Sequence, residues 1–425
     1  MSRGLCKEYL PSSIDGMPPL FDDLRRSDSS PALRCEDSFA FLNRASGIVW
    51  ERQRELLDRW YSEFPDLDGD LRRRLRARDP RQHYAAWWEL HVHALLQALG
   101  YKLTVHPPVP GTAVHPDFLA ERTDESFYVE AATVFSGIVA PSRGAKMKAS
   151  IEDILEVVDA STFHVALRWD NVGDQMPSRQ AILAPVEAWL ATLNAREVAA
   201  AEMASRHNDL WQPFTAGDWG FSLRPHTWGS RLQGCPDNPF VAYQPAIAGF
   251  TNDVRQIRNA VVRKGKHYGT PDKPLVVAVL ATNGFVNDRD VIGALYGSEA
   301  VRLNITTGKS SASRNPDGVW IGKRGAAGRR ISAILMGVGI LPNTAATAWP
   351  RLWHHYEPRY DLRAELPFST VRAMNDQLAF GDATQSASEV FNLAPDWPGP
   401  EPAFPRCLHR PEDHAPYGSI PEPAP

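Results

Sequence analysis

The chain has little cysteine, no long apolar run and no marked excess of charge of one sign. Its four cysteines, at positions 6, 35, 235 and 407 of 425 residues, form no CxxC pair. This argues against a zinc ribbon or a disulfide framework and fits a reducing compartment. No stretch approaches the roughly 18 apolar residues of a membrane-spanning helix, and the start of the chain lacks a signal-peptide pattern. We therefore expect a cytoplasmic protein with no membrane association.

Overall charge does not indicate a partner. The formal net charge is −4, so any argument for nucleic-acid binding depends on local basic patches. The hydrophobic fraction of 43% is sufficient for an ordinary core. A chain of this length holds one large domain or two of common size.

Composition divides the chain into three parts. Residues 1–45 lack periodicity and are predicted to be a loosely ordered N-terminal arm. Residues 391–425 are rich in proline, which continues neither helices nor central strands, and are predicted to be a tail. The domain is expected at 46–390.

Hydrophobic periodicity predicts the order of elements within this domain. The strongest helix is expected at 83–99, and a continuous apolar run at 274–282 is typical of a strand covered on both faces. A late hairpin is expected from 318–322 and 330–338. The remaining predicted helices are 50–62, 71–78, 180–204 and 252–268, and the remaining predicted strands are 101–105, 115–121, 127–134, 163–169 and 218–225.

Two carboxylates are expected to face each other on neighbouring strands. Asp117 lies in HPDFLAE and Glu130 in FYVEAAT, and the polar stretch between them is typical of a hairpin turn. If Ala120 pairs with Phe127, Asp117 lies opposite Glu130, with about 5 Å between the Cβ atoms. Two negative charges at that separation repel each other, and a hard divalent cation with oxygen ligands would relieve the repulsion. The pattern predicts a Mg²⁺ (or Mn²⁺) site on a sheet.

A third carboxylate, Glu89, lies on the predicted helix before these strands. The order of a helix with Glu, a strand with Asp and a strand with Glu resembles the PD-(D/E)xK nuclease superfamily, which has the restriction endonuclease-like fold. The matching segments are WELHVHALLQALGY (88–101), HPDF (115–118) and YVEAA (128–132). The resemblance covers roughly 88–134 well and 252–282 loosely.

The resemblance implies an α/β fold with a mixed central sheet flanked by helices. Its core would comprise 83–134 and 252–282, with an insertion at 135–250 and an extension at 283–390. It also implies that Asp117, Glu130 and Glu89 hold the metal, and that the protein is a Mg²⁺-dependent endonuclease or exonuclease. The substrate would be DNA phosphodiester bonds, and the resemblance suggests a setting in bacterial genome defence.

The sequence departs from the family pattern at the lysine that helps to activate water. That position is Ala132 here, on the same strand face as Glu130. Lys264 and Lys266 are the preferred substitutes, and Lys146 and Lys148 are weaker candidates. Lys264 stands four residues before Tyr268, a KxxxY spacing similar to the QxxxY element of some exonucleases in the superfamily.

Three basic clusters suggest a track for a phosphate backbone. The first is the run 71–81, with six arginines. The second comprises Arg255, Arg258, Arg263, Lys264 and Lys266. The third comprises Lys309, Arg314, Lys323, Arg324, Arg329 and Arg330. DNA is the expected partner, with RNA, a homodimer or a protein partner left open.

Other interpretations remain. Glu89 on an apolar helix is also explained as a buried carboxylate bonded to an arginine or a backbone amide, because a buried charge needs a partner. Ala132 favours a catalytically degenerate nuclease-fold protein that binds nucleic acid or a protein without cleaving. A hydrolase of another phosphoester, such as a nucleotide, is a third possibility. His91 and His93 point to different sides of their helix, cannot share a metal, and are expected in the core.

Overall fold

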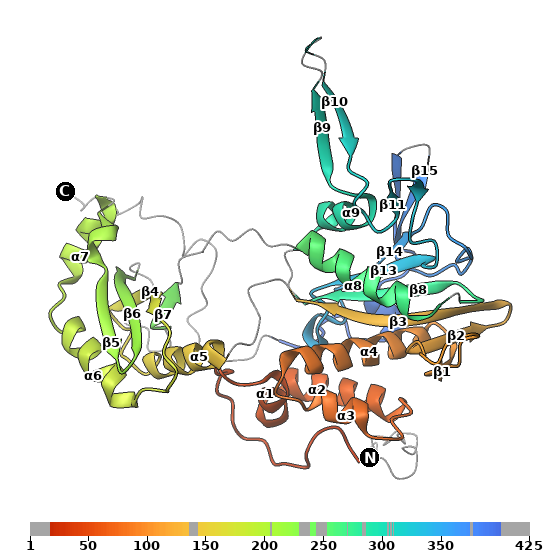
Figure 1. Ribbon diagram of the computed structural model, residues 1–425. Coiled ribbons are helices and arrows are strands. Elements are labelled where there is room, and N and C mark those ends of the chain that lie inside the picture. Colours follow the sequence, from red (N-terminus) through yellow and green to blue (C-terminus); the bar gives the residue numbers. More distant parts are fainter. Residues whose placement is uncertain are drawn as a thin grey trace, which may run out of the picture. The chain divides into compact units, whose positions relative to one another are not determined.

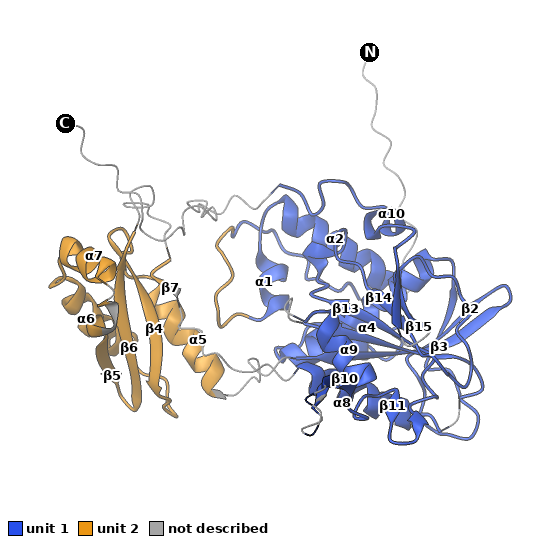
Figure 2. Ribbon diagram, turned by 90° about the horizontal axis from the view of Figure 1, so that it is seen from above, with its two compact units in different colours: residues 1–28, 37–139, 251–402 blue, residues 29–36, 140–250, 403–425 orange. Residues whose placement is uncertain are grey.

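The computed structural model describes residues 18–135, 143–204, 206–228, 239–243, 253–269, 271–282, 286–303, 306, 308, 310–374 and 377–400. The chain divides into two compact units, which are coloured separately in Figure 2. Unit 1 contains residues 1–28, 37–139 and 251–402, and unit 2 contains 29–36, 140–250 and 403–425. The segment expected as an insertion, 135–250, thus contains the main part of unit 2. The segment expected as an extension, 283–390, is part of unit 1.

Unit 1 is an α/β structure built on an eight-stranded mixed sheet (Figure 1). The strands follow the spatial order β1 (Lys102–Val105), β2 (Phe118–Arg122), β3 (Glu125–Val134), β8 (Leu275–Ala281), β13 (Ala333–Val338), β14 (Arg351–His354), β15 (Ser369–Met374) and β16 (Gln377–Gly381). The pairs β3–β8, β8–β13 and β14–β15 are parallel, and the other pairs are antiparallel. The smaller ribbons pair β9 (Glu299–Leu303) with β10 (Ser310–Arg314) and β11 (Ile321–Gly322) with β12 (Gly325–Ala326).

Helices cover both faces of this sheet (Figure 1). The helices of unit 1 are α1 (Ser38–Arg44), α2 (Ile48–Ser62), α3 (Asp70–Leu75), α4 (Pro80–Ala98), α8 (Asp253–His267), α9 (Asp288–Tyr296) and α10 (Ala387–Phe391). Strand β8 shows why two layers are needed, because all seven of its residues are buried. Val276, Ala278 and Leu280 belong to the apolar core on the α4 face, whereas Val277 and Val279 belong to the core on the α8 face.

Helix α4 is fixed at both ends and at its centre. Asp79 accepts a hydrogen bond from the Arg81 amide as the N-cap, and Gly100 adopts a positive φ of 82° just beyond the C-terminus. Trp88 donates its indole N–H to the Ala278 carbonyl at 2.9 Å, which ties the helix to the middle of the sheet. Gly337 makes room for this indole, since a Cβ there would lie 2.8 Å from Trp88 Cη2.

Unit 2 is a smaller α/β structure with a four-stranded sheet in the order β5, β6, β4, β7. Its elements are α5 (Arg143–Leu155), β4 (Phe163–Asn171), α6 (Arg179–Leu190), α7 (Ala195–Met203), β5 (Gln212–Ala216), β6 (Trp219–Thr227) and β7 (Val241–Tyr243). An apolar core that includes Ile151, Leu167, Phe221 and Phe240 belongs to this unit alone. Residues 29–36 attach to it, because Asp153 accepts hydrogen bonds from the Arg34 and Cys35 amides.

Three sequence predictions about elements are wrong. The late hairpin does not form, because β13 pairs with β8 and β14, while Ile321–Gly322 pairs with Gly325–Ala326. The helix expected at 180–204 is two helices, because Asn194 caps α7. The described part of the N-terminal arm is ordered: residues 18–28 and 37–45 belong to unit 1, where they form α1 and bury Leu20 and Phe21, and residues 29–36 belong to unit 2. Residues 1–17, and the Pro-rich tail beyond residue 400, lie outside the described residues.

No helix within the described ranges is long and apolar enough to cross a bilayer.

Candidate active site

The β2–β3 hairpin brings Asp117 and Glu130 together. Ala120 pairs with Phe127 and Phe118 with Val129, which confirms the predicted register. Extended by one residue beyond the end of β2, this register places Asp117 opposite Glu130. The Asp117 amide donates to Glu130 Oε2 at 3.3 Å, so the two residues are in direct contact.

Asp117 is held by the backbone of the opposite strand. Its Oδ2 accepts a hydrogen bond from the Ala131 amide at 2.7 Å. Burial, together with the negative charges of Glu130 and Glu89, raises the pKa of Asp117 to about 8, against the opposing effects of Lys264 and the Ala131 amide. Burial and the neighbouring negative charges therefore destabilise the charged form of Asp117, and an additional positive charge would stabilise it.

Glu130 is buried, with 2% of its surface exposed, and its charge is balanced from α8. The ammonium group of Lys264 binds Oε1, and the hydroxyl group of Tyr268 donates to Oε2. Burial and the charge of Glu130 raise the pKa of Tyr268 above its usual range, so this phenol remains a hydrogen-bond donor. The KxxxY spacing noted in the sequence thus corresponds to two side chains that bind one carboxylate.

Helix spacing explains this double contact. Residues four apart lie on one face of a helix, and α8 packs over β3 and β8 with that face toward the sheet. Gly265, between the two lysines of KGK, allows a close approach, because a Cβ there would lie 2.6 Å from Ile331 Cδ1. Gly269 has a positive φ of 55° and follows the end of the helix.

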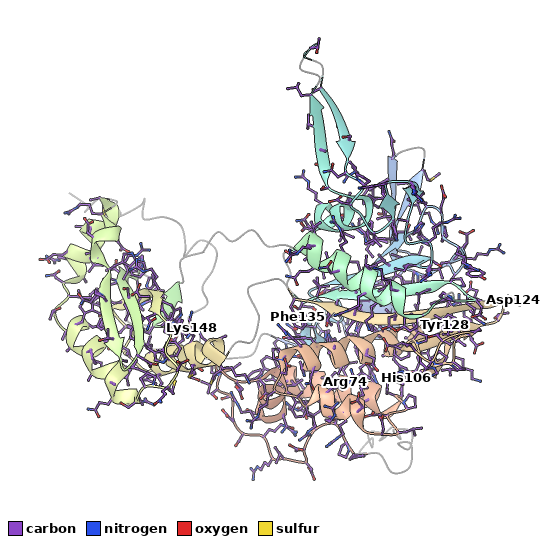
Figure 3. The ribbon with its side chains drawn as sticks, viewed as in Figure 1. Arg74, His106, Asp124, Tyr128, Phe135 and Lys148 are labelled. Atoms are coloured by element: carbon purple, nitrogen blue, oxygen red, sulfur yellow. The ribbon has the colours of Figure 1, made fainter. Side chains whose placement is uncertain are left out.

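Glu89 is buried on α4 and paired with an arginine. Arg74 of α3 binds Glu89 Oε2 at 2.8 Å and also binds Asp70 at 2.6 Å. Burial raises the pKa of Glu89, while the charges of Arg74 and His106 oppose that rise. The His106 amide donates to the Asp117 carbonyl at 3.0 Å, which links this residue to the carboxylate pair. Arg74 and His106 lie on the α4 side of the sheet, and Tyr128 lies on β3 (Figure 3).

The sequence did not identify Arg74 or His106 as neighbours of the carboxylates. Arg74 belongs to the basic run 71–81, for which the sequence predicts a phosphate track. The alternative explanation of Glu89, a buried carboxylate bonded to an arginine, describes the contact that the structure contains. No sequence signal identifies His106.

Of the four lysine candidates, only Lys264 contacts a carboxylate of this site among the described residues. Ala132, in the family's usual lysine position, is buried in the core between β3 and α8. Lys266, two residues after Lys264, is exposed and lines a cavity to which neither Asp117 nor Glu130 contributes. Lys146 and Lys148 belong to α5 of unit 2, where Lys148 lies 5.3 Å from the ring centre of Trp169.

His91 and His93 of α4 lie in the core, as expected. His91 is fully buried next to Trp88, and burial lowers its pKa to about 3. Burial also lowers the pKa of His93, to about 4. Both rings are therefore neutral at physiological pH.

The described residues contain no group of three or more His, Cys, Asp or Glu side chains arranged to hold a metal ion. The site offers instead a pair of adjacent carboxylates, Asp117 and Glu130, with Glu89 close enough to influence Asp117 electrostatically. Asp117 Oδ1 has no hydrogen-bond partner among the described residues, whereas Oδ2 is bound by a backbone amide. One free carboxylate oxygen therefore remains at the pair.

The first basic cluster is largely structural. Arg72 donates to the Pro19 carbonyl, Arg73 and Arg74 bind Asp70, and Arg76 binds Asp22. Four of its six arginines are thus bound within the protein, and the phosphate track along 71–81 stays a prediction. In the second cluster Arg258 binds Asp317 at 3.3 Å, whereas Arg255, Arg263 and Lys266 are exposed. Lys309, in the third cluster, lies outside the described residues.

No family model matches the chain, and neither a curated protein nor a solved structure matches it significantly. The assignment of function therefore depends on the chemistry of the site.

Proposed function

We propose that this protein is a metal-dependent nuclease of the restriction endonuclease-like type. It would hydrolyse DNA phosphodiester bonds at an active site that contains Asp117 and Glu130. The observation that supports the proposal is the contact between the Asp117 backbone amide and the Glu130 carboxylate across the β2–β3 hairpin, with Lys264 bound to Glu130. The charge pattern matches what phosphodiester hydrolysis requires: oxygen ligands for a cation, and an amine near the attacked phosphate.

The donor set fits Mg²⁺ or Mn²⁺. Mg²⁺ in phosphoryl-transfer sites is commonly held by one or two carboxylates, with water and substrate phosphates completing the shell, so two protein carboxylates suffice. The raised pKa of Asp117 and the free Oδ1 are the features that a cation would satisfy. A bound cation would orient the phosphate, lower the pKa of a bound water and offset developing charge.

The protein's own groups have separable roles in this proposal. Asp117 and Glu130 would be the metal ligands. Lys264 would orient the attacking water or offset charge, in place of the amine missing at Ala132. Tyr268, which donates to Glu130, would position that carboxylate. Glu89, bound by Arg74, would act on the metal through water or through its charge.

A second candidate function is a catalytically degenerate nuclease-fold protein that binds nucleic acid or a protein partner. The hydrogen bonds of Glu130 favour this second function, because both of its carboxylate oxygens already accept hydrogen bonds from protein donors. In that case the carboxylate cluster would serve only to fix α8 on the sheet. Hydrolysis of a smaller phosphoester, such as a nucleotide, is a variant of the first proposal with a different substrate.

The test is cleavage of linear, circular and single-stranded DNA with Mg²⁺ or Mn²⁺ by the wild type and by Asp117→Ala and Glu130→Ala. Cleavage by the wild type that both substitutions abolish, with unchanged circular dichroism, supports the nuclease. A folded wild-type protein that binds neither metal nor DNA and cleaves none of the substrates would contradict it. Metal-dependent hydrolysis of nucleotides without cleavage of DNA would indicate the smaller phosphoester.

A further inference from the structure

A cavity of about 780 Å³ lies beside α8. It is lined by Val262, Gly265, Lys266, Val319, Ala326, Ala327, Gly328, Arg329, Arg330, Ile331 and Arg359. None of the candidate catalytic carboxylates lines it, and neither does Lys264. Its volume falls within the range of about 300–1,000 Å³ that is usual for small-molecule sites.

Its charge is entirely positive. Lys266, Arg329, Arg330 and Arg359 are the charged residues of the lining, and no carboxylate is among the described lining residues. No ion pair involves any of these four side chains in the described part of the chain. Like charges gathered around one hollow repel each other, and a bound anion removes that repulsion.

The cavity is built from segments far apart in the sequence. Lys266 comes from α8, while Arg329 and Arg330 follow the β11–β12 ribbon. The Arg359 amide donates to the Arg329 carbonyl at 2.6 Å, and Arg329 Nε donates to the Glu357 carbonyl at 3.0 Å. These bonds fix the backbone of two arginines relative to each other and leave the terminal guanidinium nitrogens of Arg329 without a partner among the described residues.

The loop that carries the arginines depends on a glycine. Gly328 has a positive φ of 63°, and a Cβ there would lie 2.7 Å from the Val319 carbonyl oxygen. Beneath the charged rim, the apolar lining is formed by Val262, Val319 and Ile331, and Ile331 is almost fully buried. The cavity therefore combines a cationic rim with an apolar wall.

We propose that this cavity, defined by Lys266, Arg329, Arg330 and Arg359, binds the phosphate groups of a nucleotide. Arginine matches phosphate through paired N–H donors, and the apolar wall fits the sugar or base that a bare inorganic anion lacks. The nucleotide is either free or part of a nucleic-acid strand, because both present the same phosphate and base chemistry. The inference is independent of the proposed cleavage, since no residue is shared between the cavity lining and the proposed catalytic groups.

The test uses two probes in EDTA, so that cleavage plays no part. A fluorescein-labelled single-stranded dT oligonucleotide is titrated by anisotropy, and ATP is titrated by calorimetry, both at 50 and 200 mM salt. The variants are Arg329→Gln/Arg330→Gln and, on the other segments of the rim, Lys266→Gln/Arg359→Gln. The matched control is Lys102→Gln/Arg289→Gln, which removes two exposed cations from β1 and α9.

We expect each cavity variant to raise Kd at least tenfold for the bound probe, the control to change it less than twofold, and affinity to fall with salt. If excess ATP does not displace the bound oligonucleotide, the ligand is a nucleic-acid strand. If ATP binds and the oligonucleotide does not, the ligand is a free nucleotide. The proposal is overturned if neither probe binds the wild type, or if both cavity variants bind as the wild type does. Unchanged thermal unfolding would show that the variants are folded.

Discussion

Lys264 on α8 binds the carboxylate of Glu130 on β3, although 134 positions of the chain separate them. The contact places an amine at a carboxylate of the candidate site, on the sheet face where Ala132 leaves none. Tyr268, one turn further along, binds the second oxygen of the same carboxylate. Helix α8 therefore holds Glu130 in position. Its Lys264 also supplies the positive charge that Ala132 of β3 does not.

If this amine takes part in cleavage, Lys264→Ala should lower the single-turnover rate of DNA cleavage by about 10²-fold or more, the usual loss when a positioned electrostatic group is removed. Lys264→Arg, which keeps the charge, should retain more activity than the alanine variant. Lys102→Ala, on exposed β1, is the control and should cleave at the wild-type rate. Full activity in Lys264→Ala would exclude the substituted-lysine account.

The raised pKa of Asp117 predicts a pH-dependent stability. An unfolded aspartate titrates near 3.9, whereas the native group titrates at about 8, so the native state binds more protons between these values. The free energy of unfolding of the metal-free protein should therefore fall as pH rises from about 4 to about 8. Asp117→Asn should remove this part of the pH dependence and raise Tm at pH 8, by about 2–4 °C for each kcal/mol.

Thermal unfolding in EDTA across this pH range measures the effect. Asp124→Asn, at an exposed position in the β2–β3 turn, is the matched control and should follow the wild type (Figure 3). If the stability of Asp117→Asn depends on pH as that of the wild type does, the pKa of Asp117 is not raised in the native protein.

Divalent metal should reverse this loss of stability. A ligand that binds only the native state stabilises it by about 2.7 kcal/mol at a concentration of 100 Kd. Mg²⁺ or Mn²⁺ should therefore raise Tm of the wild type, and more at pH 8 than at pH 5, because protonated Asp117 does not ligate metal. Asp117→Ala should show no such rise, and an equal rise in that variant would place the metal elsewhere.

Arg74 should be important for stability through Glu89. Removing one partner of a buried ion pair costs about 3–5 kcal/mol, and the partial exposure of Arg74 (21% of its side chain) reduces that loss. We expect Arg74→Ala to destabilise the protein by about 2–4 kcal/mol in urea unfolding. Arg73→Ala, which breaks an exposed pair with Asp70, should cost about 1 kcal/mol or less.

The double variant Arg74→Ala/Glu89→Gln separates charge from packing. Recovery of much of the stability in this variant would show that the uncompensated carboxylate is the cause. Equal loss in the single and double variants would indicate that the arginine acts mainly by packing.

The local parts of the fold were predictable from the sequence. The register of the β2–β3 hairpin followed from the polar turn between two alternating segments, and α4 and β8 followed from their apolar content. Each of these signals lies within one element or between two adjacent ones. The spacing of Lys264 and Tyr268 was also local, which is why their shared helix face could be predicted.

Long-range pairing was not predictable in the same way. Strand β13 has the composition of a hairpin strand, but the packing of the whole sheet determines that its partners are β8 and β14. Arg74 lies in a run of arginines whose spacing does not show that Glu89, 15 residues away, is its partner. Many apolar and charged residues of similar pattern compete for such contacts, and only the packing of the assembled layers selects among them.

The most direct test of the central claim is the single-turnover rate of DNA cleavage by wild type and Glu130→Gln, with Mg²⁺ and saturating DNA. The substitution replaces one carboxylate oxygen by an amide nitrogen and keeps the shape of the side chain. The account predicts cleavage by the wild type that EDTA abolishes, and a rate at least about 10²-fold lower in the folded variant. Equal rates in the two proteins, or cleavage by the wild type that persists in EDTA, would contradict it.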